Sequence, residues 1–333
     1  MKSRNEYIDI AKGIAIFLVV WGHVIKYTLP TGNDIYNLIY SFHMPVFFCI
    51  SGYFANNTFL RESAIVFFLK KSYTILLPFI VWGTLYAYYS YLPATSLFLD
   101  KYNLGYWFLI TLYTLYILFL IMKKIFIYFK LNNIIIEALL FGFFYILIYL
   151  IEINKIQVTE TIKQLFSIHY ICKYYPFFIA GYFINKYNAK INNIIKTNTT
   201  FSISTLLFII CFIIKEYYWE SSILILICGM TGSYSCIYLV KSYYKQIPFR
   251  KSLLYMGSHS LNIYVIHYFF LNLDLTSINT VFFKNDANLT LCILLTLIIA
   301  VSIIILSLTI NSILTISNIF NFILFGKRNS INS

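Results

Sequence analysis

Residues 7–23 read YIDIAKGIAIFLVVWGH, an apolar run that carries Lys12 near one end and His23 at the other. At about 100° per residue, a separation of eleven residues returns to nearly the same face of a helix. The ammonium and the imidazole therefore share one stripe, about 16 Å apart along the helix axis. Ionisable groups are costly in lipid and usually face a bundle interior or a wet cavity. The run predicts a membrane helix with a path or a site along one face.

The composition of the whole chain indicates a multi-spanning membrane protein. Of its 333 residues, 60% are hydrophobic, 20% are aromatic and 11% are charged, whereas soluble domains average about 25% charged residues. The net charge of +13 does not indicate a nucleic-acid partner, because the basic residues are scattered between apolar segments.

Ten apolar windows come close to the ~20 residues that cross a bilayer. They cover residues 8–28, 35–54, 72–92, 104–122, 133–151, 167–185, 199–214, 221–240, 253–272 and 289–310. The last apolar stretch continues to Phe325 but is interrupted by asparagines, which predicts a C-terminal interfacial helix after the final span. We expect an all-α integral membrane protein with one domain over residues 1–325 and a short cytoplasmic tail over 326–333.

Basic residues alternate between the loops. The rich loops hold Lys2, Arg4, Arg61, Lys70, Lys71, Lys123, Lys124, Lys130, Lys186, Lys190, Lys196, Lys241, Lys245, Arg250, Lys251, Lys327 and Arg328, and the poor loops hold Lys101, Lys155, Lys163, Lys215 and Lys284. The positive-inside rule places the rich loops and both termini in the cytoplasm. Because both termini then lie on the same side of the membrane, the number of spans must be even, which agrees with the ten apolar windows.

Three histidines are expected at a similar depth. Counting about 1.5 Å per residue from the cytoplasmic ends of their spans, His23 lies about 22 Å up and His267 about 21 Å up. His43 lies about 12 Å below the outer face, so all three reach the outer half of a ~30 Å core. Lys12 is expected near the cytoplasmic face, with Asp9 three residues earlier within helical reach.

Simpler interpretations exist for the same residues. A histidine in a span is often a hydrogen-bonded packing residue, and this applies to His43, His169 and His259. A lysine such as Lys12 can snorkel to the headgroups with an acidic partner. Trp107 fits an interfacial aromatic belt.

Residues 40–53 read YSFHMPVFFCISGY. With the Lys12 and His23 spacing before it, this segment resembles the start of the acyltransferase family 3 membrane proteins, and most of all their fucose 4-O-acetylase-like and surface polysaccharide O-acetyltransferase branch. Later segments are similar to weaker family motifs, among them 70–78, 106–109 and 257–267. An Arg-x-x-Arg pattern found at the third span of many members is absent, because KKSYT stands at residues 70–74.

The resemblance implies an enzyme that takes acetyl groups from cytoplasmic acetyl-CoA and delivers them to hydroxyls of glycans or lipid-linked sugars. It implies that His23 is catalytic, either as a general base or as an acyl carrier. It also implies that Lys12, Lys70 and Lys71 pair with the phosphates of acyl-CoA. Candidate orienting or acceptor-binding residues are Asp9, His43, Ser51, Trp107, Ser260 and His267. Ser51 and Ser260 are either oxyanion donors or small packing residues.

The sequence therefore predicts an O-acyltransferase of the bacterial inner membrane that uses acetyl-CoA as donor substrate, with no bound cofactor and no metal. Its expected acceptor is a surface polysaccharide or its polyisoprenyl-linked precursor, and membrane lipids surround it. A glycan or acyl-group transporter is the alternative, and a purely structural membrane partner is a third hypothesis. The sugar and the choice of acetyl over succinyl stay open.

Overall fold

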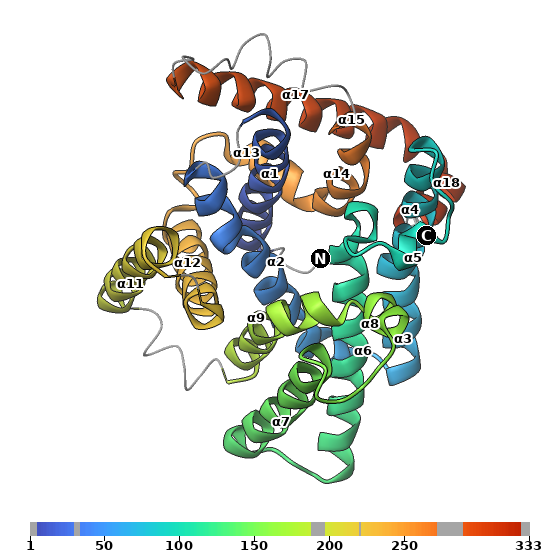
Figure 1. The fold of residues 1–333 in the computed structure, drawn as a ribbon, viewed down its shortest axis with the longest axis vertical. Helices are drawn as coiled ribbons and strands as arrows, with labels where there is room; N and C mark the ends of the chain where they lie inside the picture. The colour runs from blue at the N-terminus through green and yellow to red at the C-terminus, as the bar shows by residue number, and fades with distance from the viewer. Residues whose placement is uncertain (1–4, 30–33, 188–196, 220, 272–288, 328–333) are drawn as a thin grey trace. The chain divides into compact units, whose positions relative to one another are not determined.

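The computed structural model describes residues 5–29, 34–187, 197–219, 221–271 and 289–327, and these residues form helices joined by turns, with no β-strand among them (Figure 1). This confirms the all-α class. The predicted loop residues Lys2, Arg4, Lys190, Lys196, Lys284 and Arg328, and the tail beyond residue 327, lie outside the described residues.

The helices group into two compact units, one built from residues 1–47 and 192–314 and the other from residues 48–191 and 315–333. The boundary falls inside α2, which is one continuous helix from Asp34 to Arg61. The single domain expected over residues 1–325 stays a prediction.

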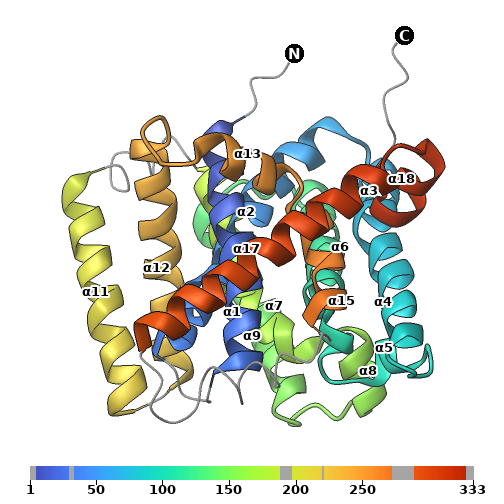
Figure 2. The ribbon, with the colours of Figure 1, turned by 90° about the horizontal axis from the view of Figure 1, so that it is seen from above.

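The first unit is arranged around α1 (Glu6–Thr28). Its other helices are the first part of α2, α11 (Asn198–Tyr217), α12 (Ser222–Tyr243), α13 (Arg250–Ser258), α14 (Ser260–Ile266), α15 (Tyr268–Leu271) and α17 (Leu289–Leu314). Helices α11 and α12 lie side by side in both views, and α17 crosses α1 obliquely (Figure 2). The indole Nε1 of Trp21 donates to Thr296 Oγ1 at 3.1 Å and ties α1 to α17.

The second unit contains the rest of α2 and the helices on either side of α6 (Trp107–Tyr128). These are α3 (Ala64–Lys71), the π-helical turn η1 (Ser72–Leu76), α4 (Leu77–Tyr89), α5 (Ser96–Leu99), the 3₁₀ turn η2 (Asn103–Gly105), α7 (Ile134–Glu152), α8 (Glu160–Leu165), α9 (Ile168–Lys186) and α18 (Asn318–Phe325). In η1 the backbone N–H of Leu77 donates to the carbonyl of Ser72, five residues earlier. One extra residue is thereby accommodated between α3 and α4.

A buried ion pair ties α7 to α9 in this unit. Glu137 is fully buried, pairs with Lys186 and accepts a hydrogen bond from the Tyr182 hydroxyl at 2.8 Å. Lys123 of α6 is also buried, 5.4 Å from the Tyr182 ring and 3.5 Å from the amide oxygen of Asn56. A lone buried charge is costly. The carboxylate of Glu137 offsets the positive charge of the nearby Lys186 and Lys123.

Among the described residues, eight helices are long and apolar enough to cross a membrane. They match eight of the ten apolar windows predicted from the sequence. The two other windows do not form a helix that is both long and apolar enough. Helix α9, at 167–185, is a continuous but more polar interior helix, with Lys173, Pro176 and several buried tyrosines. Window 253–272 is broken into α13, α14 and α15 at His259 and His267. The number of spans and the side on which the termini lie stay predictions.

Helix α18 follows the last long helix as a separate element. Its Leu324 carbonyl accepts a hydrogen bond from the Trp82 indole at 2.8 Å, and Phe325 is fully buried beside that ring. Gly326 ends the helix in a left-handed conformation with φ 63°, where a side chain would be strained. A helix is thus present where the interfacial helix was predicted, and its place in the membrane interface stays a prediction.

Candidate active site

Helix α1 holds the Lys12 and His23 stripe within the first unit. The Nζ of Lys12 lies 3.5 Å from Asp9 Oδ1, and Asp9 is buried while Lys12 is partly exposed. His23 is half-buried near the opposite end of the helix. The two predicted residues are therefore not in contact, and Lys12 meets Asp9 as the three-residue spacing indicates.

Two glycines let α13 approach α1 closely. A Cβ at Gly13 would overlap the backbone carbonyl of Leu253, and a Cβ at Gly257 would overlap the carbonyl of Asp9. An ion pair between Arg250 and Glu6 closes the same interface. Small residues allow close backbone approach between membrane helices, and here they bring the broken segment 250–271 against the charged stripe of α1.

His267 sits at the break between α14 and α15 and is fully buried. Its Nδ1 lies 2.7 Å from the carbonyl of Tyr264 and 3.2 Å from that of Ile263. A carbonyl only accepts, so Nδ1 carries the proton of the neutral ring and Nε2 keeps a lone pair. Among the described residues this buried Nε2 has no hydrogen-bond partner. This is unusual, because buried polar atoms nearly always have a hydrogen-bond partner.

His23 meets this segment through Tyr268, the first residue of α15. The Tyr268 hydroxyl lies 3.2 Å from His23 Nε2, and the two ring centroids are 5.2 Å apart. The His23 and His267 rings are 5.3 Å apart, and His267 packs against Tyr268 at 4.2 Å. Two imidazoles and a phenol thus form one cluster in the first unit.

Tyr40 links this cluster to the third predicted histidine. Its ring lies 6.3 Å from His23 and 4.8 Å from His43. The Nδ1 of His43 is 2.6 Å from the Ile39 carbonyl, four residues earlier on α2, and the ring is buried. Gly22 of α1 allows the approach, since a Cβ there would crowd the Tyr40 ring. The count along the spans predicted a similar depth for the three imidazoles. In the structure His23 lies beside His267, and the Tyr40 ring lies near both His23 and His43.

Tyr268 and Tyr40 were missed from the sequence. Tyr40 precedes His43 by three residues, a spacing that places both on one helix face, and this signal was available. Tyr268 directly follows His267, and in one unbroken helix two adjacent residues point about 100° apart. Its contact with His23 joins two separate helices, and the hydropathy pattern does not contain such a contact.

The other predicted residues have different surroundings. Ser260 is the first residue of α14 and is half-buried. His259 lies at the α13 to α14 break, with Nδ1 2.9 Å from the Tyr255 carbonyl. His169 of α9, in the second unit, lies 2.8 Å from Glu152 and is exposed. These contacts fit the packing interpretation of His169 and His259.

Four further predicted residues belong to the second unit. Lys70 pairs with Glu62, while the Nζ of Lys71 lies 3.7 Å from the centroid of the Tyr116 ring. Ser51 accepts a hydrogen bond from the Tyr116 hydroxyl at 3.3 Å through its backbone carbonyl. Trp107 is stacked on the Tyr170 ring at 4.1 Å. Lys71, Tyr116 and Ser51 thus form a second group.

No group of three or more histidine, cysteine, aspartate or glutamate residues in the described part of the chain is arranged to hold a metal ion. The His23, His43 and His267 rings are instead interleaved with the rings of Tyr40 and Tyr268. This arrangement suits proton transfer by neutral imidazoles, which combine a donor and an acceptor nitrogen.

A family profile described as Acyltransferase domain matches residues 5–311. The chain belongs to this acyltransferase family. The matched range contains every histidine and tyrosine of the cluster, and it covers segments of both units. The family resemblance seen in the sequence is thereby confirmed.

Two curated relatives show a shorter match. Nodulation protein NolL from Mesorhizobium japonicum is 39% identical over 89 residues, which cover 25% of this chain and 24% of that protein. Nodulation protein NolL from Sinorhizobium fredii is 36% identical over 89 residues, with the same shares of each chain. The matched segments thus span about a quarter of these relatives. No solved structure matches the chain.

Proposed function

We propose that this acyltransferase family member is an integral-membrane O-acyltransferase. It moves an acetyl group from cytoplasmic acetyl-CoA to a hydroxyl of a bacterial surface polysaccharide or its lipid-linked precursor. The observation that carries this proposal is the contact of His23 with Tyr268 beside the buried His267. The relatives' printed name concerns nodulation and specifies no acceptor, so the acceptor is proposed only as a class.

In the proposed reaction, a neutral imidazole of the cluster takes the proton of the acceptor hydroxyl. The hydroxyl oxygen attacks the acetyl carbonyl carbon, the carbon–sulfur bond of the thioester breaks, and the CoA thiolate leaves and takes the proton. His23 performs this base step, or it first accepts the acetyl group on a ring nitrogen and passes it on. The Tyr268 hydroxyl holds the His23 ring in one orientation during either route.

His267 offers a place for the acceptor hydroxyl. With Nδ1–H donated to its own helix, its Nε2 accepts a hydrogen bond, and none of the described residues supplies one. A buried acceptor without a donor costs about 1–3 kcal/mol. A substrate hydroxyl that donates its one proton to this nitrogen removes that cost and lies beside His23. On this route His267 takes the proton, and His23 is the acyl carrier.

Lys12 is proposed to attract the anionic part of acetyl-CoA. Its ammonium lies on the same stripe as His23 and is partly exposed beside Asp9. Lys71 in the second unit is a further candidate, since its Nζ rests on aromatic rings and no carboxylate oxygen of the described residues is within 4.0 Å of it. An ammonium in such a setting favours an anionic ligand.

The test compares surface glycans of cells with the wild-type protein, the deletion, and the His23→Ala variant at equal expression. Base-labile O-acetyl groups measured by NMR should be lost in both altered strains. His169→Ala is the matched control, because His169 is exposed and paired with Glu152 on another helix. Full acetylation with His23→Ala would reject the catalytic assignment, and a change in glycan export alone would favour a transporter.

A further inference from the structure

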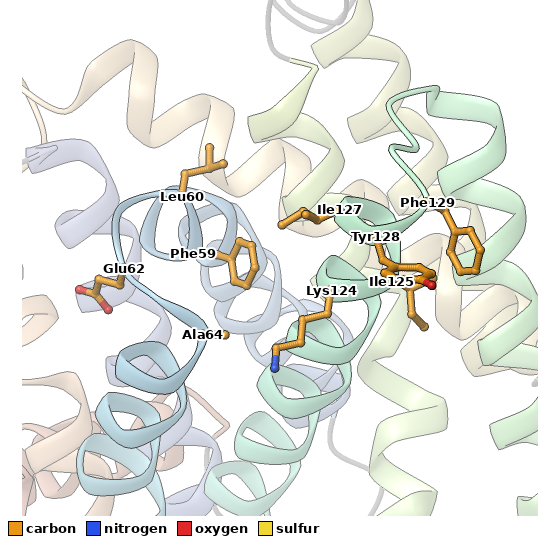
Figure 3. A pocket seen from close by; sticks show the side chains of 9 residues that line it. All are labelled: Phe59, Leu60, Glu62, Ala64, Lys124, Ile125, Ile127, Tyr128 and Phe129. Carbon is orange, nitrogen blue, oxygen red and sulfur yellow. The ribbon is translucent and has the colours of Figure 1, made fainter.

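An apolar groove of about 780 Å³ opens where α2 and α6 end and α3 begins, all within the second unit (Figure 3). Its walls include Phe59, Leu60, Ile127, Tyr128 and Phe129. Leu60 and Ile127 are 69% and 63% exposed. An apolar surface of this kind on a membrane-spanning helix pair faces lipid tails.

A second apolar groove of about 630 Å³ adjoins the first one. The two share Ile125 and Phe129, and the second continues over α7 along Leu139 and Phe143. Ile125 and Phe129 therefore form a ridge with an apolar groove on each side.

A single cation lies in the first groove. Lys124 is exposed and is among the lining residues, four residues before the end of α6. Among the described residues no carboxylate oxygen lies within 4.0 Å of its Nζ. The one carboxylate in the lining, Glu62, pairs with Lys70 and points away from Lys124 (Figure 3). The groove thus offers a positive charge with no carboxylate partner among the described residues.

We propose that these two grooves bind one anionic diacyl phospholipid. The acyl chains lie in the two grooves on either side of the Ile125 and Phe129 ridge, and the headgroup phosphate contacts Lys124. The match is one of shape and charge, since the ligand has two apolar chains and one anionic group. A soluble nucleotide phosphate would satisfy Lys124 but would leave both apolar grooves exposed. This inference does not depend on the acyl-transfer chemistry.

The experiment is native mass spectrometry of the detergent-purified full chain after exchange into phosphatidylglycerol or phosphatidylcholine with the same chains. Wild-type protein should retain phosphatidylglycerol about fivefold more than phosphatidylcholine, the factor expected for one lysine near an anionic headgroup. Lys124→Ala should abolish this preference. Lys130→Ala is the matched control, because Lys130 is exposed in the same region but does not line either groove.

A second pair of variants tests the groove itself. Ala64→Trp places an indole in the first groove and should lower retention of both lipids, while Ile65→Trp, at an exposed neighbour outside the lining, should not. Equal loss of phosphatidylglycerol in Lys124→Ala and Lys130→Ala would overturn the proposal in favour of a diffuse surface charge. Displacement of the lipid by acetyl-CoA would indicate a nucleotide site instead, and replacement of lipid adducts by dimer would indicate a second copy of the chain. Unaltered retention by the Ala64→Trp variant, shown to be folded by its melting temperature, would also reject the proposal.

Discussion

The hydroxyl of Tyr268 lies 3.2 Å from the Nε2 of His23, although 245 positions separate the two residues. The contact is made where α14 ends at His267 and α15 begins with Tyr268. The proposed catalytic imidazole is therefore oriented by a residue from the far end of the family domain.

Tyr268→Phe removes this hydroxyl and keeps the ring. We expect kcat for acetyl transfer to fall about two- to tenfold, as for the loss of one hydrogen bond, with KM for acetyl-CoA little changed. Tyr255→Phe is the control, since Tyr255 is an exposed tyrosine of α13. Steady-state kinetics on the purified protein make the comparison, and equal kcat values for the two variants would contradict a role in orienting His23.

His267→Asn tests the role of Nε2 separately from that of Nδ1. The asparagine amide can still donate to the Tyr264 carbonyl, but it lacks a basic atom in the position of Nε2. If Nε2 receives the acceptor hydroxyl, transfer should fall by about 10²–10⁴-fold while the melting temperature changes little. His259→Asn is the matched control, because its Nδ1 also bonds a carbonyl four residues earlier. A His267→Asn enzyme with full activity would show that this nitrogen is a packing feature.

Gly257→Ala tests the contact between α1 and α13. The added methyl would overlap the Asp9 carbonyl, and overpacking of this kind costs about 1–3 kcal/mol. A lower melting temperature in detergent and a loss of activity are expected together, because α13 leads into the His267 segment. Gly142→Ala serves as the control, since nothing lies near that Cβ and alanine is the better helix former. The same shift in both variants would show that helix propensity, and not the close approach, governs the result.

Glu137→Gln tests the buried ion pair of the second unit. It leaves the partly buried Lys186 without its carboxylate, which is itself fully buried, and breaking a buried pair costs about 3–5 kcal/mol. Combining it with Lys186→Met should restore part of the stability, because Lys186 is then no longer unpaired, while the buried Lys123 still lacks the carboxylate. Glu160→Gln should lower thermal stability less, because the Glu160 carboxylate is exposed and the buried Lys163 keeps its hydrogen bond to the Asn154 amide oxygen. A double variant no more stable than Glu137→Gln would indicate that the carboxylate acts through other partners, such as Tyr182.

The sequence predicted those parts of the molecule that depend on helical periodicity and hydropathy. The all-α class and most of the helical windows follow from composition and from counting residues along spans, as does the prediction of a similar depth for His23, His43 and His267. The breaks at His259 and His267 are not marked by a loss of apolar character, so a hydropathy window cannot show them. Trp107 was considered both for an interfacial belt and for the site. Its ring stacks on Tyr170, and both assignments stay predictions.

The sequence says less about which residues bind the acyl donor and the acyl acceptor. Lys12, Lys70 and Lys71 were grouped by the family resemblance and their charge. In the structure Lys70 has a carboxylate partner, and the Nζ of Lys71 lies over an aromatic ring. Such differences arise from side chains far apart in the chain, which spacing along one helix does not relate.

The π-helical turn at Ser72–Leu76 bears on how chain length varies among related proteins. A π-turn contains one residue more than the α-helix that would replace it, so a one-residue deletion there can be absorbed without a loop. Such a deletion would rotate Lys71 by about 100° relative to α4 and move its ammonium off the Tyr116 ring. In an alignment of related chains, a single gap at 72–76 should therefore accompany replacement of the lysine or of its tyrosine, and gaps that occur independently of both would show that the pair is dispensable.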